Sequence, residues 1–435
     1  MFVDKAYRES KPLFNRGRIG WALFDWANQA FTTIVITFVF AQYFAQGIVQ
    51  DEVGAQSMWG IGVGLSAAAI AILAPILGSI ADRSGRRRPW VIGFSAMCIA
   101  LTCGLYFMLP DPQFAMTAII LVALANICYE MAIVFNNAML ADLVDRPRLA
   151  KLGGIAWSGG YYGGLVSLVL CLAAVFVLPD PNESQVPVRI TSVIVAVWFA
   201  LFLIPFILWT PDKRPTGVPM AVAVREGLSS LWNTIRALFS NDRNIFMYLL
   251  GRMTYTDGVN TIFVMGGVYA SARYGLDTME LIQFGILLNV FSGTGGMVFA
   301  FFEERLGTKS VIMISILGLI VSGSAMLLAP DFSMFTVYGC ILGVFVGPIQ
   351  QASRTMMAKL APADSQAKLF GLYALSGKAT SWGGPILVGV MTAMAASWGW
   401  SDNNALTFGM FGVMPFMVAG FIIMLFVRSA PKTEA

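Results

Sequence analysis

Six ionisable residues interrupt segments that are otherwise apolar. They are Asp25, Glu130, Arg252, Asp257, Arg354 and Lys378. An ionisable side chain inside a bilayer is costly unless it is paired or faces water, so each is a candidate for binding a solute or an ion. The chain has no histidine, which leaves carboxylates as the acid–base groups available for coupling at neutral pH. Asp25, Glu130 and Asp257 are therefore the predicted proton-coupling set.

Two alternatives stay open for these charges. The coupling ion could be sodium, which Asp25, Asn28 and backbone carbonyl groups would bind. All six charges could instead form fixed ion pairs that hold a helix bundle together, with Asp257 and Lys378 as the most plausible pair of the second half. Arg252 and Asp257 are five residues apart on one predicted helix, about 140° around it, so they should not pair with each other.

Amide and aromatic side chains flank the charges along the sequence. The amides Asn28, Asn260 and Gln350 are predicted to bind solute or ion. The predicted cavity aromatics are Trp26, Tyr129, Tyr161 and Tyr255, with Trp382 as a further flanking ring. A cavity with both signs of charge, amides and flat apolar faces suits a small zwitterion such as an amino acid. For any single ring, packing or anchoring at the membrane interface is the alternative.

The elements that position these residues are membrane-spanning helices. Hydrophobic residues make up 57% of the 435 residues and charged residues 12%, about half the charge of a soluble domain. Apolar stretches of about 20 residues recur, each long enough to cross a bilayer. We predict an all-α polytopic membrane protein with twelve spans, at about 19–48, 55–81, 90–109, 114–141, 152–178, 188–209, 244–271, 279–302, 310–329, 334–359, 367–396 and 404–427.

The distribution of Lys and Arg between the loops predicts the orientation. The N-terminal tail carries five (Lys5, Arg8, Lys11, Arg16 and Arg18), and the opposite side of the membrane has only Arg189 and Arg273. Lys and Arg accumulate in cytoplasmic loops. Both termini are therefore predicted to be cytoplasmic. The five cysteines lie inside apolar runs without metal-ligand spacing, so neither a metal site nor a cofactor is expected.

The chain divides into two halves around a connector. The predicted domains are an N-terminal six-helix bundle at 1–209, a cytoplasmic connector with an amphipathic helix at 210–243, and a C-terminal six-helix bundle at 244–435. Asp25-Trp-Ala-Asn28 in the first span is echoed by Asp257-Gly-Val-Asn260 in the seventh. Ala150-Lys-Leu-Gly-Gly154 is likewise echoed by Ala367-Lys-Leu-Phe-Gly371. Repeats that run in the same direction across the membrane indicate a duplicated transporter architecture.

Two short basic loops occupy matching places in the halves. The first runs from Gly78 through Asp82, Arg83, Gly85, Arg86 and Arg87 to Arg88. The second contains Glu304, Arg305, Gly307 and Lys309. Such charge cannot lie within hydrocarbon, so each loop is expected at the cytoplasmic surface. An orientation signal would account for the arginines, but it would not account for Gly78, Asp82 and Gly85.

Over its full length the chain resembles the major facilitator superfamily of transporters, and Gly78 to Arg88 resembles that superfamily's loop between helices 2 and 3. In the second copy, Ala300 replaces the leading glycine and Glu304 the aspartate. The resemblance implies that Asp82 meets the start of the eleventh span and closes the cytoplasmic side. Three further segments resemble the autophagy-linked vacuolar amino-acid effluxers and their bacterial relatives: Phe24–Phe31, Gly159–Gly164 and Gln350–Arg354.

These observations predict a secondary transporter, not an enzyme. It would move an amino acid or similar zwitterion by alternating access in the bacterial inner membrane. Efflux is favoured by the resemblance alone. The expected partners are the solute, a coupling proton and membrane lipids; nucleic acid is not expected, and a monomer is. The alternatives are a permease or flippase for a peptide, glycan or lipid-linked compound, and a non-transporting membrane sensor.

Overall fold

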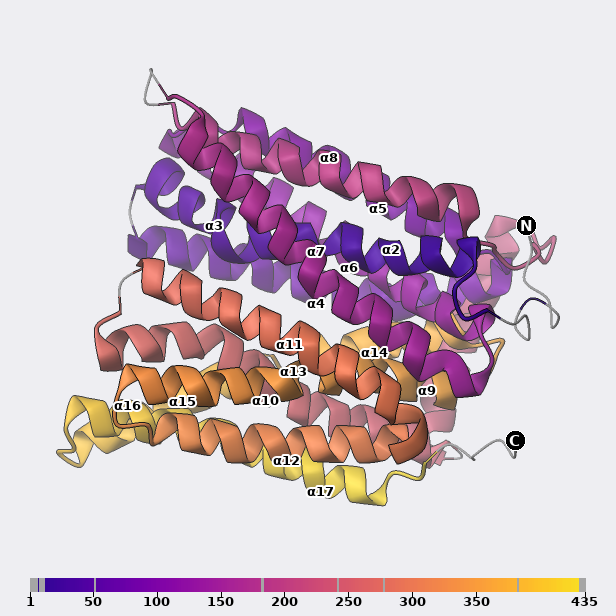
Figure 1. Cartoon of the computed structure of the whole chain (residues 1–435). Coiled ribbons are helices and arrows are strands. Elements are labelled where there is room, and N and C mark those ends of the chain that lie inside the picture. Colours follow the sequence, from indigo (N-terminus) through magenta and orange to yellow (C-terminus); the bar gives the residue numbers. More distant parts are fainter. Residues whose placement is uncertain are drawn as a thin grey trace. The chain divides into compact units, whose positions relative to one another are not determined.

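The computed structural model describes residue 7 and residues 12–50, 52–180, 184–240, 242–276, 278–381 and 383–429. Lys5, Arg8, Lys11 and Trp382 lie outside the described residues. Long helices joined by short loops form the described part of the chain (Figure 1). Contacts between residues divide the chain into two compact units.

Unit 1 comprises Met1–Asp145, Gly159–Ser229 and Pro362–Gly371. Its long helices are α2 (Arg16–Ala30), α4 (Glu52–Ser84), α5 (Arg88–Gly104), α6 (Ala115–Leu143), most of α7 (Leu149–Val177) and α8 (Val186–Trp209). Helix α2 packs against α8, and α6 packs against both α4 and α5 (Figure 1).

The first span is not a uniform α-helix. After α2 the chain continues through a π-helical stretch at Phe31–Phe38, a short turn α3 at Phe40–Gln42 and a second π-helical stretch at Tyr43–Val49. π-Helical turns are rare in proteins, and those that occur are often found at functional sites. The predicted charge Asp25 lies in α2, just before the first of these stretches.

Unit 2 comprises Arg146–Ser158, Ser230–Ala361 and Leu372–Ala435. Its helices are α10 (Arg243–Tyr274), α11 (Thr278–Leu306), α12 (Thr308–Leu327), α13 (Phe332–Leu360), the second part of α14 (Gln366–Lys378), α15 (Gly383–Ser397), α16 (Asp402–Met410) and α17 (Met414–Phe426). Helix α13 packs against α11 and α12, and α10 packs against α17. Short 3-10 turns complete the fold at Leu105–Phe107, Pro112–Phe114, Arg146–Arg148 and Phe411–Val413.

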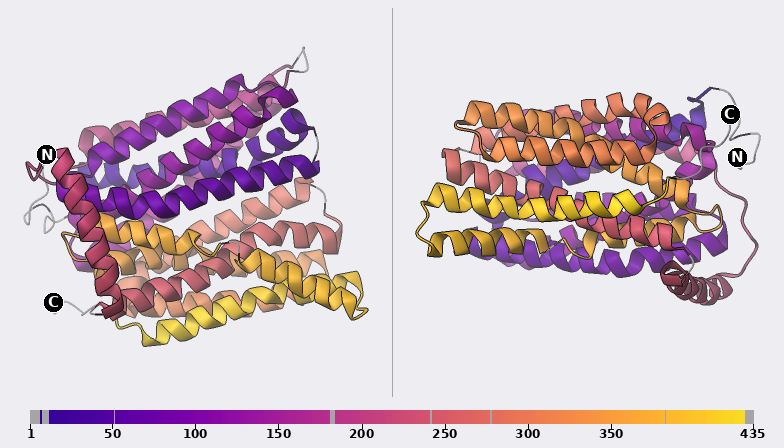
Figure 2. Two further views of the ribbon diagram at one scale, coloured as in Figure 1. Left: turned by 180° about the vertical axis from the view of Figure 1, so that it is seen from behind. Right: turned by 90° about the horizontal axis from the view of Figure 1, so that it is seen from below.

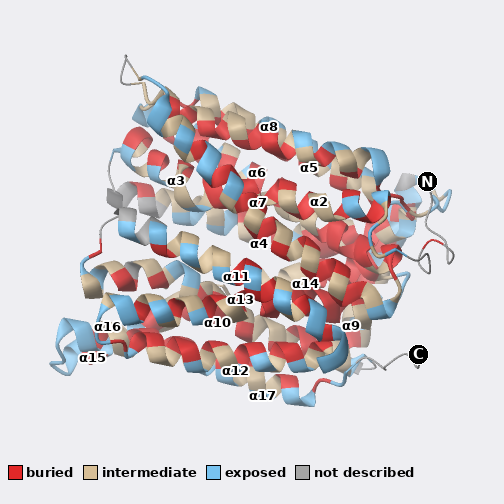
Figure 3. Cartoon of the chain, viewed as in Figure 1, coloured by how far each residue is buried: buried red, intermediate tan, exposed pale blue. Residues whose placement is uncertain are grey.

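The membrane spans agree with the prediction. Within the described residues, 11 helical segments are long and apolar enough to cross a bilayer. The remaining predicted span is α10, which has 32 residues but is less apolar because it carries Arg252 and Asp257 among small and polar residues. The outer faces of α8 and α12 expose large apolar side chains such as Leu201, Leu208 and Val321, as lipid contact requires (Figure 3).

The eleventh span, predicted at 367–396, is one apolar segment at Gln366–Ser397. It is divided into α14 and α15, with turns at 379–381 between them (Figure 2). Pro385 has no backbone N–H to donate, and Gly383 and Gly384 lower the helical propensity of the same stretch. The twelfth span is similarly divided between α16 and α17, at the 3-10 turn that precedes Pro415.

The predicted amphipathic helix of the connector is α9 (Met220–Ser240). It runs crosswise to α4 (Figure 2). The two helices touch closely at Gly227, where an added Cβ would lie 3.1 Å from the backbone nitrogen of Ile80. Along α9, Val224, Leu228 and Trp232 recur every four residues and are exposed.

Candidate functional site

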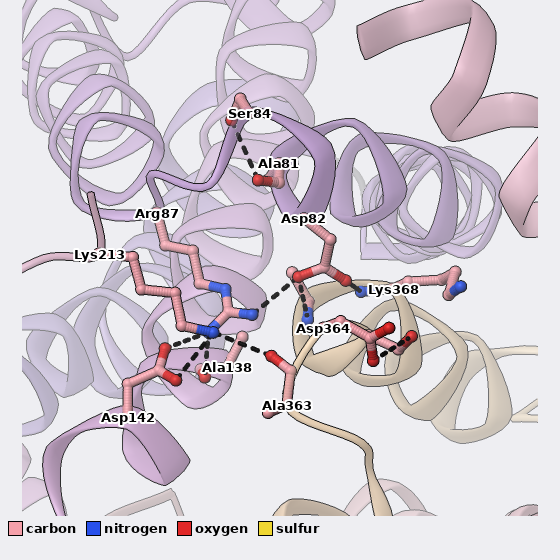
Figure 4. A network of polar contacts seen from close by, with 12 residues as sticks. Ala81, Asp82, Ser84, Arg87, Ala138, Asp142, Lys213, Ala363, Asp364 and Lys368 are labelled. Carbon is pink, nitrogen blue, oxygen red and sulfur yellow. Dashed lines mark hydrogen bonds and ion pairs between the residues drawn. The ribbon is translucent and has the colours of Figure 1, made fainter. Parts of the chain in front are cut away.

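The carboxylate of Asp82 lies at the end of α4 and meets the beginning of α14 (Figure 4). Its two oxygens accept hydrogen bonds from the backbone N–H groups of Ala367 (3.0 Å) and Lys368 (2.8 Å). The first N–H groups of a helix have no partner within the helix and carry its positive dipole end, so a carboxylate is favoured there. The expected contact of Asp82 with the start of the eleventh span is confirmed.

Arg87 connects Asp82 to α6. Its Nη2 lies 2.8 Å from Asp82 Oδ1, and its Nη1 donates to the carboxylate of Asp142 and to the Ala138 carbonyl oxygen (Figure 4). The arginine is 2% exposed. Burial alone would lower the pKa of Arg87, but the carboxylates of Asp142 and Asp82 outweigh it and raise this pKa. The guanidinium is therefore a fixed positive charge between two acids.

Two residues of the connector complete this network. Lys213 Nζ lies 2.9 Å from Asp142 Oδ1 and donates to the Ala363 carbonyl oxygen, also at 2.9 Å. Asp212 accepts hydrogen bonds from the backbone N–H groups of Arg87 (3.1 Å) and Arg88 (3.2 Å). Burial and the charge of Arg87 lower the pKa of Lys213, although Asp142 opposes that shift. The connector thus ties the loop after α4 to the chain just before α14.

The glycines of this loop have a steric role. A Cβ on Gly78 would lie 2.4 Å from the Ala367 carbonyl oxygen, so only glycine allows this approach of α4 to α14. Gly85 has φ +80° and turns the chain towards α5. The two flanking arginines are more exposed: Arg83 lies 3.7 Å from Glu226 of α9, and Arg86 lies 3.6 Å from Asp212.

The loop of the second half repeats the turn but not the ion network. Gly307 again has positive φ, +87°. Glu303 is fully buried, bonds to Thr308 and lies near Lys359, whereas Glu304 and Arg305 are exposed. The buried acid of this loop is therefore Glu303. Aligning the two loops by sequence pairs Glu304 with Asp82 and so does not identify Glu303.

Arg252 of α10 lies against α14 within unit 2. Its Nη1 donates to the Tyr373 carbonyl oxygen (2.6 Å) and the Ser376 hydroxyl (2.7 Å). Its guanidinium carbon lies 3.4 Å from the centre of the Tyr373 ring, a cation–π contact. A Cβ on Gly377 would lie 2.9 Å from Nη1, so this glycine makes room for the guanidinium.

Two other candidates of α10 face the same part of the eleventh span. The carboxylate of Asp257 is 3% exposed and accepts a hydrogen bond from Thr380, at the interruption between α14 and α15. Asn260 Nδ2 donates to the Gly377 carbonyl oxygen (3.4 Å). Lys378 is the last residue of α14. The structure thus places Arg252, Asp257 and Asn260 along α10 opposite the broken span; an ion pair between Asp257 and Lys378 stays a prediction.

In unit 1 the candidates lie between α2 and α6. Asp25 Oδ1 accepts a hydrogen bond from Asn136 Nδ2 (3.4 Å), and Asn28 is buried one turn further along α2. The Tyr129 hydroxyl lies 3.4 Å from the Thr32 hydroxyl and interacts electrostatically with both Glu130 and Asp25. These residues form one polar group beside the π-helical part of the first span.

The remaining candidates are placed as follows. Trp26 stacks on Trp198 of α8, with ring centres 5.8 Å apart, so its ring packs against the sixth span. The Tyr255 hydroxyl lies 2.7 Å from the Ser353 hydroxyl of α13. Arg354 is buried, and its guanidinium carbon lies 5.8 Å from the centre of the Trp157 ring. Gln350 is half-buried. Tyr161 is 9% exposed.

Comparison with known proteins decides the family. Residues 44–434 match the family described as "Vacuole effluxer Atg22 like". The chain belongs to the Atg22-like vacuole effluxer family. A Bacillus subtilis relative, the uncharacterized MFS-type transporter YxiO, is 25% identical over 97% of both chains. Autophagy-related protein 22 of Pichia angusta is 22% identical over 74% of this chain and 67% of its own length.

Solved structures agree on the fold of this Atg22-like protein. The E. coli fucose:proton symporter FucP matches 95% of the chain with a TM-score of 0.67 and 13% identity. The human organic anion transporter MFSD10 matches 95% with a TM-score of 0.66. These likenesses show the major facilitator fold, as predicted. The family match and the apolar spans of the described residues identify the chain as an integral membrane transporter.

Sequence reasoning missed several residues of these sites. Asp142, Asp212 and Lys213 join the network around Arg87, and Tyr373, Ser376 and Thr380 face the charges of α10. Asp142 and Lys213 could have been noticed as charges directly at the ends of apolar runs. The hydroxyl residues carry no comparable signal, because serine and threonine are common throughout membrane helices.

Proposed function

We propose that this protein exports a small zwitterion, an amino acid or a similar solute, by alternating access. The observation that carries the proposal is the placement of Arg252, Asp257 and Asn260 on α10, opposite the interruption between α14 and α15. Transporters build solute and ion sites at interrupted helices, whose freed backbone groups and nearby charges bind the cargo. Export is proposed by analogy with the family, which is described as vacuole effluxers.

Transport is proposed to be proton-coupled through Asp25, Glu130 and Asp257. Each carboxylate lies in a membrane span, where the neutral form gains from desolvation and the charged form gains from water access. A cavity that opens to each side in turn would let such a group load and release a proton. FucP and XylE, which share the fold, are described as proton symporters.

The network around Asp82 is proposed to hold the cytoplasmic side closed. The bonds from Asp82 to Ala367 and Lys368 join the second span to the eleventh, and Lys213 adds the connector. Opening would break these bonds. The arginine-rich loops support a cytoplasmic location of both termini. The proposed location is a bacterial inner membrane.

Counterflow into proteoliposomes tests the function. The full-length protein is reconstituted with an unlabelled amino-acid mixture inside, and uptake of each labelled L-amino acid is followed together with the lumenal pH. We expect accumulation of at least one amino acid with proton movement. The Asp257→Asn, Glu130→Gln double variant should lose proton movement, and Asp402→Asn, an exposed acid, should retain it.

Three results would contradict parts of the proposal. Proton movement by the double variant equal to that of the unchanged protein would remove the carboxylate mechanism. Accumulation that depends on sodium and not on pH would replace the proton with sodium. Absence of counterflow for every amino acid, by protein that is folded and correctly inserted, would remove the proposed substrate class.

A further inference from the structure

The guanidinium of Arg252 has an unusual set of neighbours for a charge inside a membrane span. Among the described residues it contacts a backbone carbonyl, a serine hydroxyl and an aromatic ring, and it contacts no carboxylate. The ionisable groups that act on it are the hydroxyls of Tyr248, Tyr255 and Tyr373. Tyrosine is neutral at pH 7, so within the described part of the chain no negative charge is bonded to this guanidinium.

The arrangement also leaves hydrogen-bonding capacity unused. Both hydrogen bonds come from Nη1, while the Nε–H is buried and has no acceptor in the described structure. A guanidinium offers five N–H donors in a planar fork that matches a carboxylate. The side chain as a whole is only half-buried, so part of it stays accessible.

Neighbouring groups hold the guanidinium in place without neutralising it. Gly377 leaves the space that Nη1 occupies, since a Cβ there would lie 2.9 Å away. The Tyr373 ring lies against one face of the guanidinium. Asn260 bonds to the Gly377 carbonyl oxygen and adds an amide to the same wall. An arginine used only as a structural bridge would be expected to meet an acid, because an unpaired buried charge is strongly destabilising.

We infer that Arg252 binds the carboxylate group of the transported solute. The inference rests on the proposed function and names the chemistry of one end of the substrate: the solute brings the negative charge that the protein does not supply. An ion pair between guanidinium and carboxylate is formed by two parallel hydrogen bonds. Arg252 would therefore distinguish an acid from its ester or from the corresponding amine.

Competition in the counterflow assay tests this. For an amino acid that the protein transports, the unlabelled acid, its methyl ester and its decarboxylated amine are compared as competitors. We expect the ester and the amine to compete roughly 10- to 100-fold less well than the acid, the loss of one charge-assisted interaction. Arg252→Gln should weaken binding of the acid by a similar factor and leave the ester unchanged, which removes the preference.

Further variants separate binding from folding. Arg252→Lys keeps the positive charge but loses the planar guanidinium that binds a carboxylate through two hydrogen bonds. This variant should retain part of the preference for the acid over its ester. Gly377→Ala should displace the guanidinium and weaken the acid selectively. Arg273→Gln changes an arginine at the other end of α10 and should leave all three competitors unaffected.

The outcomes distinguish the two proposals. If an amino acid is transported but its ester competes equally well in the unchanged protein, the inference is wrong and the proposed function stands. The same holds if Arg252→Gln weakens acid and ester equally, which is the result of a structural role. If no amino acid is transported, the proposed substrate class is wrong and the inference falls with it. Should Arg252→Gln fail to fold, the ester comparison and Arg252→Lys still decide.

Discussion

The two loops that follow the second and eighth spans share a turn but differ in what surrounds it. Both place a glycine at positive φ, Gly85 at +80° and Gly307 at +87°. In unit 1 the acid Asp82 binds the start of α14 and belongs to a network with Arg87, Asp142 and Lys213. In unit 2 the buried acid Glu303 bonds to Thr308 and lies near Lys359.

This difference shows which features of a repeated motif are conformational and which are electrostatic. The turn is set by backbone geometry, so both copies keep it. The ion network depends on partners outside the motif, on α6, the connector and α14, and only the first loop has that set. We therefore expect the first loop to respond strongly to changes of charge and the second to respond weakly.

The largest effect is expected from Arg87→Met. The change leaves Asp82 and Asp142 buried without their shared cation, which typically costs about 3–5 kcal/mol. Thermal unfolding of the purified protein in detergent measures the loss. The control is Arg86→Met, because Arg86 is half-exposed and should change stability by less than about 1 kcal/mol. Equal unfolding temperatures for the two variants would show that the network adds no stability.

A smaller effect is expected from Asp82→Asn, paired with Glu304→Gln. Asn keeps one oxygen that can accept from the start of α14 but removes the negative charge there, which is worth up to about 2 kcal/mol in a partly buried geometry. Glu304 is exposed, so its neutral variant should behave like the unchanged protein. The same unfolding measurement compares both. If Glu304→Gln were as destabilising as Asp82→Asn, the two loops would be electrostatically equivalent after all.

Close helix contacts at glycine also differ between the two units. Gly78 lies on α4 in unit 1, but in unit 2 the small residue is Gly154 of α7, whose added Cβ would lie 2.4 Å from Ala300 Cβ. Gly154→Ala should cost about 1–3 kcal/mol by overpacking. The double variant Gly154→Ala, Ala300→Gly should recover part of that loss of unfolding stability. Absence of any recovery would place the conflict elsewhere, such as at Gln351, whose side-chain oxygen is 2.3 Å from the same added Cβ.

The smallest effect is expected from Glu303→Gln. Glu303 is fully buried, and Gln keeps an oxygen that can accept from Thr308. Lys359 is only half-buried and also donates to Thr308, so it is not left as an unpaired buried charge. The attraction to a half-buried lysine is weakened by water, so stability should change by less than about 1 kcal/mol. A loss of unfolding stability equal to that of Asp82→Asn would mean that the second loop also depends on its charge.

The membrane helices were predictable because bilayer thickness and apolar composition determine them directly. The predicted span 334–359 is α13 at Phe332–Leu360, and 188–209 is α8 at Val186–Trp209. The predicted span 367–396 is confirmed as one apolar segment at Gln366–Ser397, within which the helix is interrupted between α14 and α15. Gly383, Gly384 and Pro385 are visible in the sequence, but membrane helices often tolerate such residues when neighbours satisfy the freed backbone groups. Whether the helix breaks is therefore decided by its surroundings.

The sequence predicted which charged residues belong to the candidate site, but it did not predict which residues they contact. Arg252 and Asp257 stand out because charges are rare in apolar spans, whereas Tyr373, Ser376 and Thr380 became visible as their neighbours only through packing. Likewise Glu303 and Glu304 are adjacent in sequence but point about 100° apart around a helix, so one is buried and the other exposed.

The sequence by itself determined that this chain crosses a membrane repeatedly, that its halves repeat, and that a few charges lie where hydrocarbon should be. These features follow from local composition and from spacing along the chain. The tertiary structure decided that Asp82 meets the start of α14, that the connector supplies Lys213, and that Arg252 faces hydroxyl groups and an aromatic ring. The physical reason is that an electrostatic interaction depends on distance and burial, and residues more than a hundred positions apart acquire both only when the helices pack.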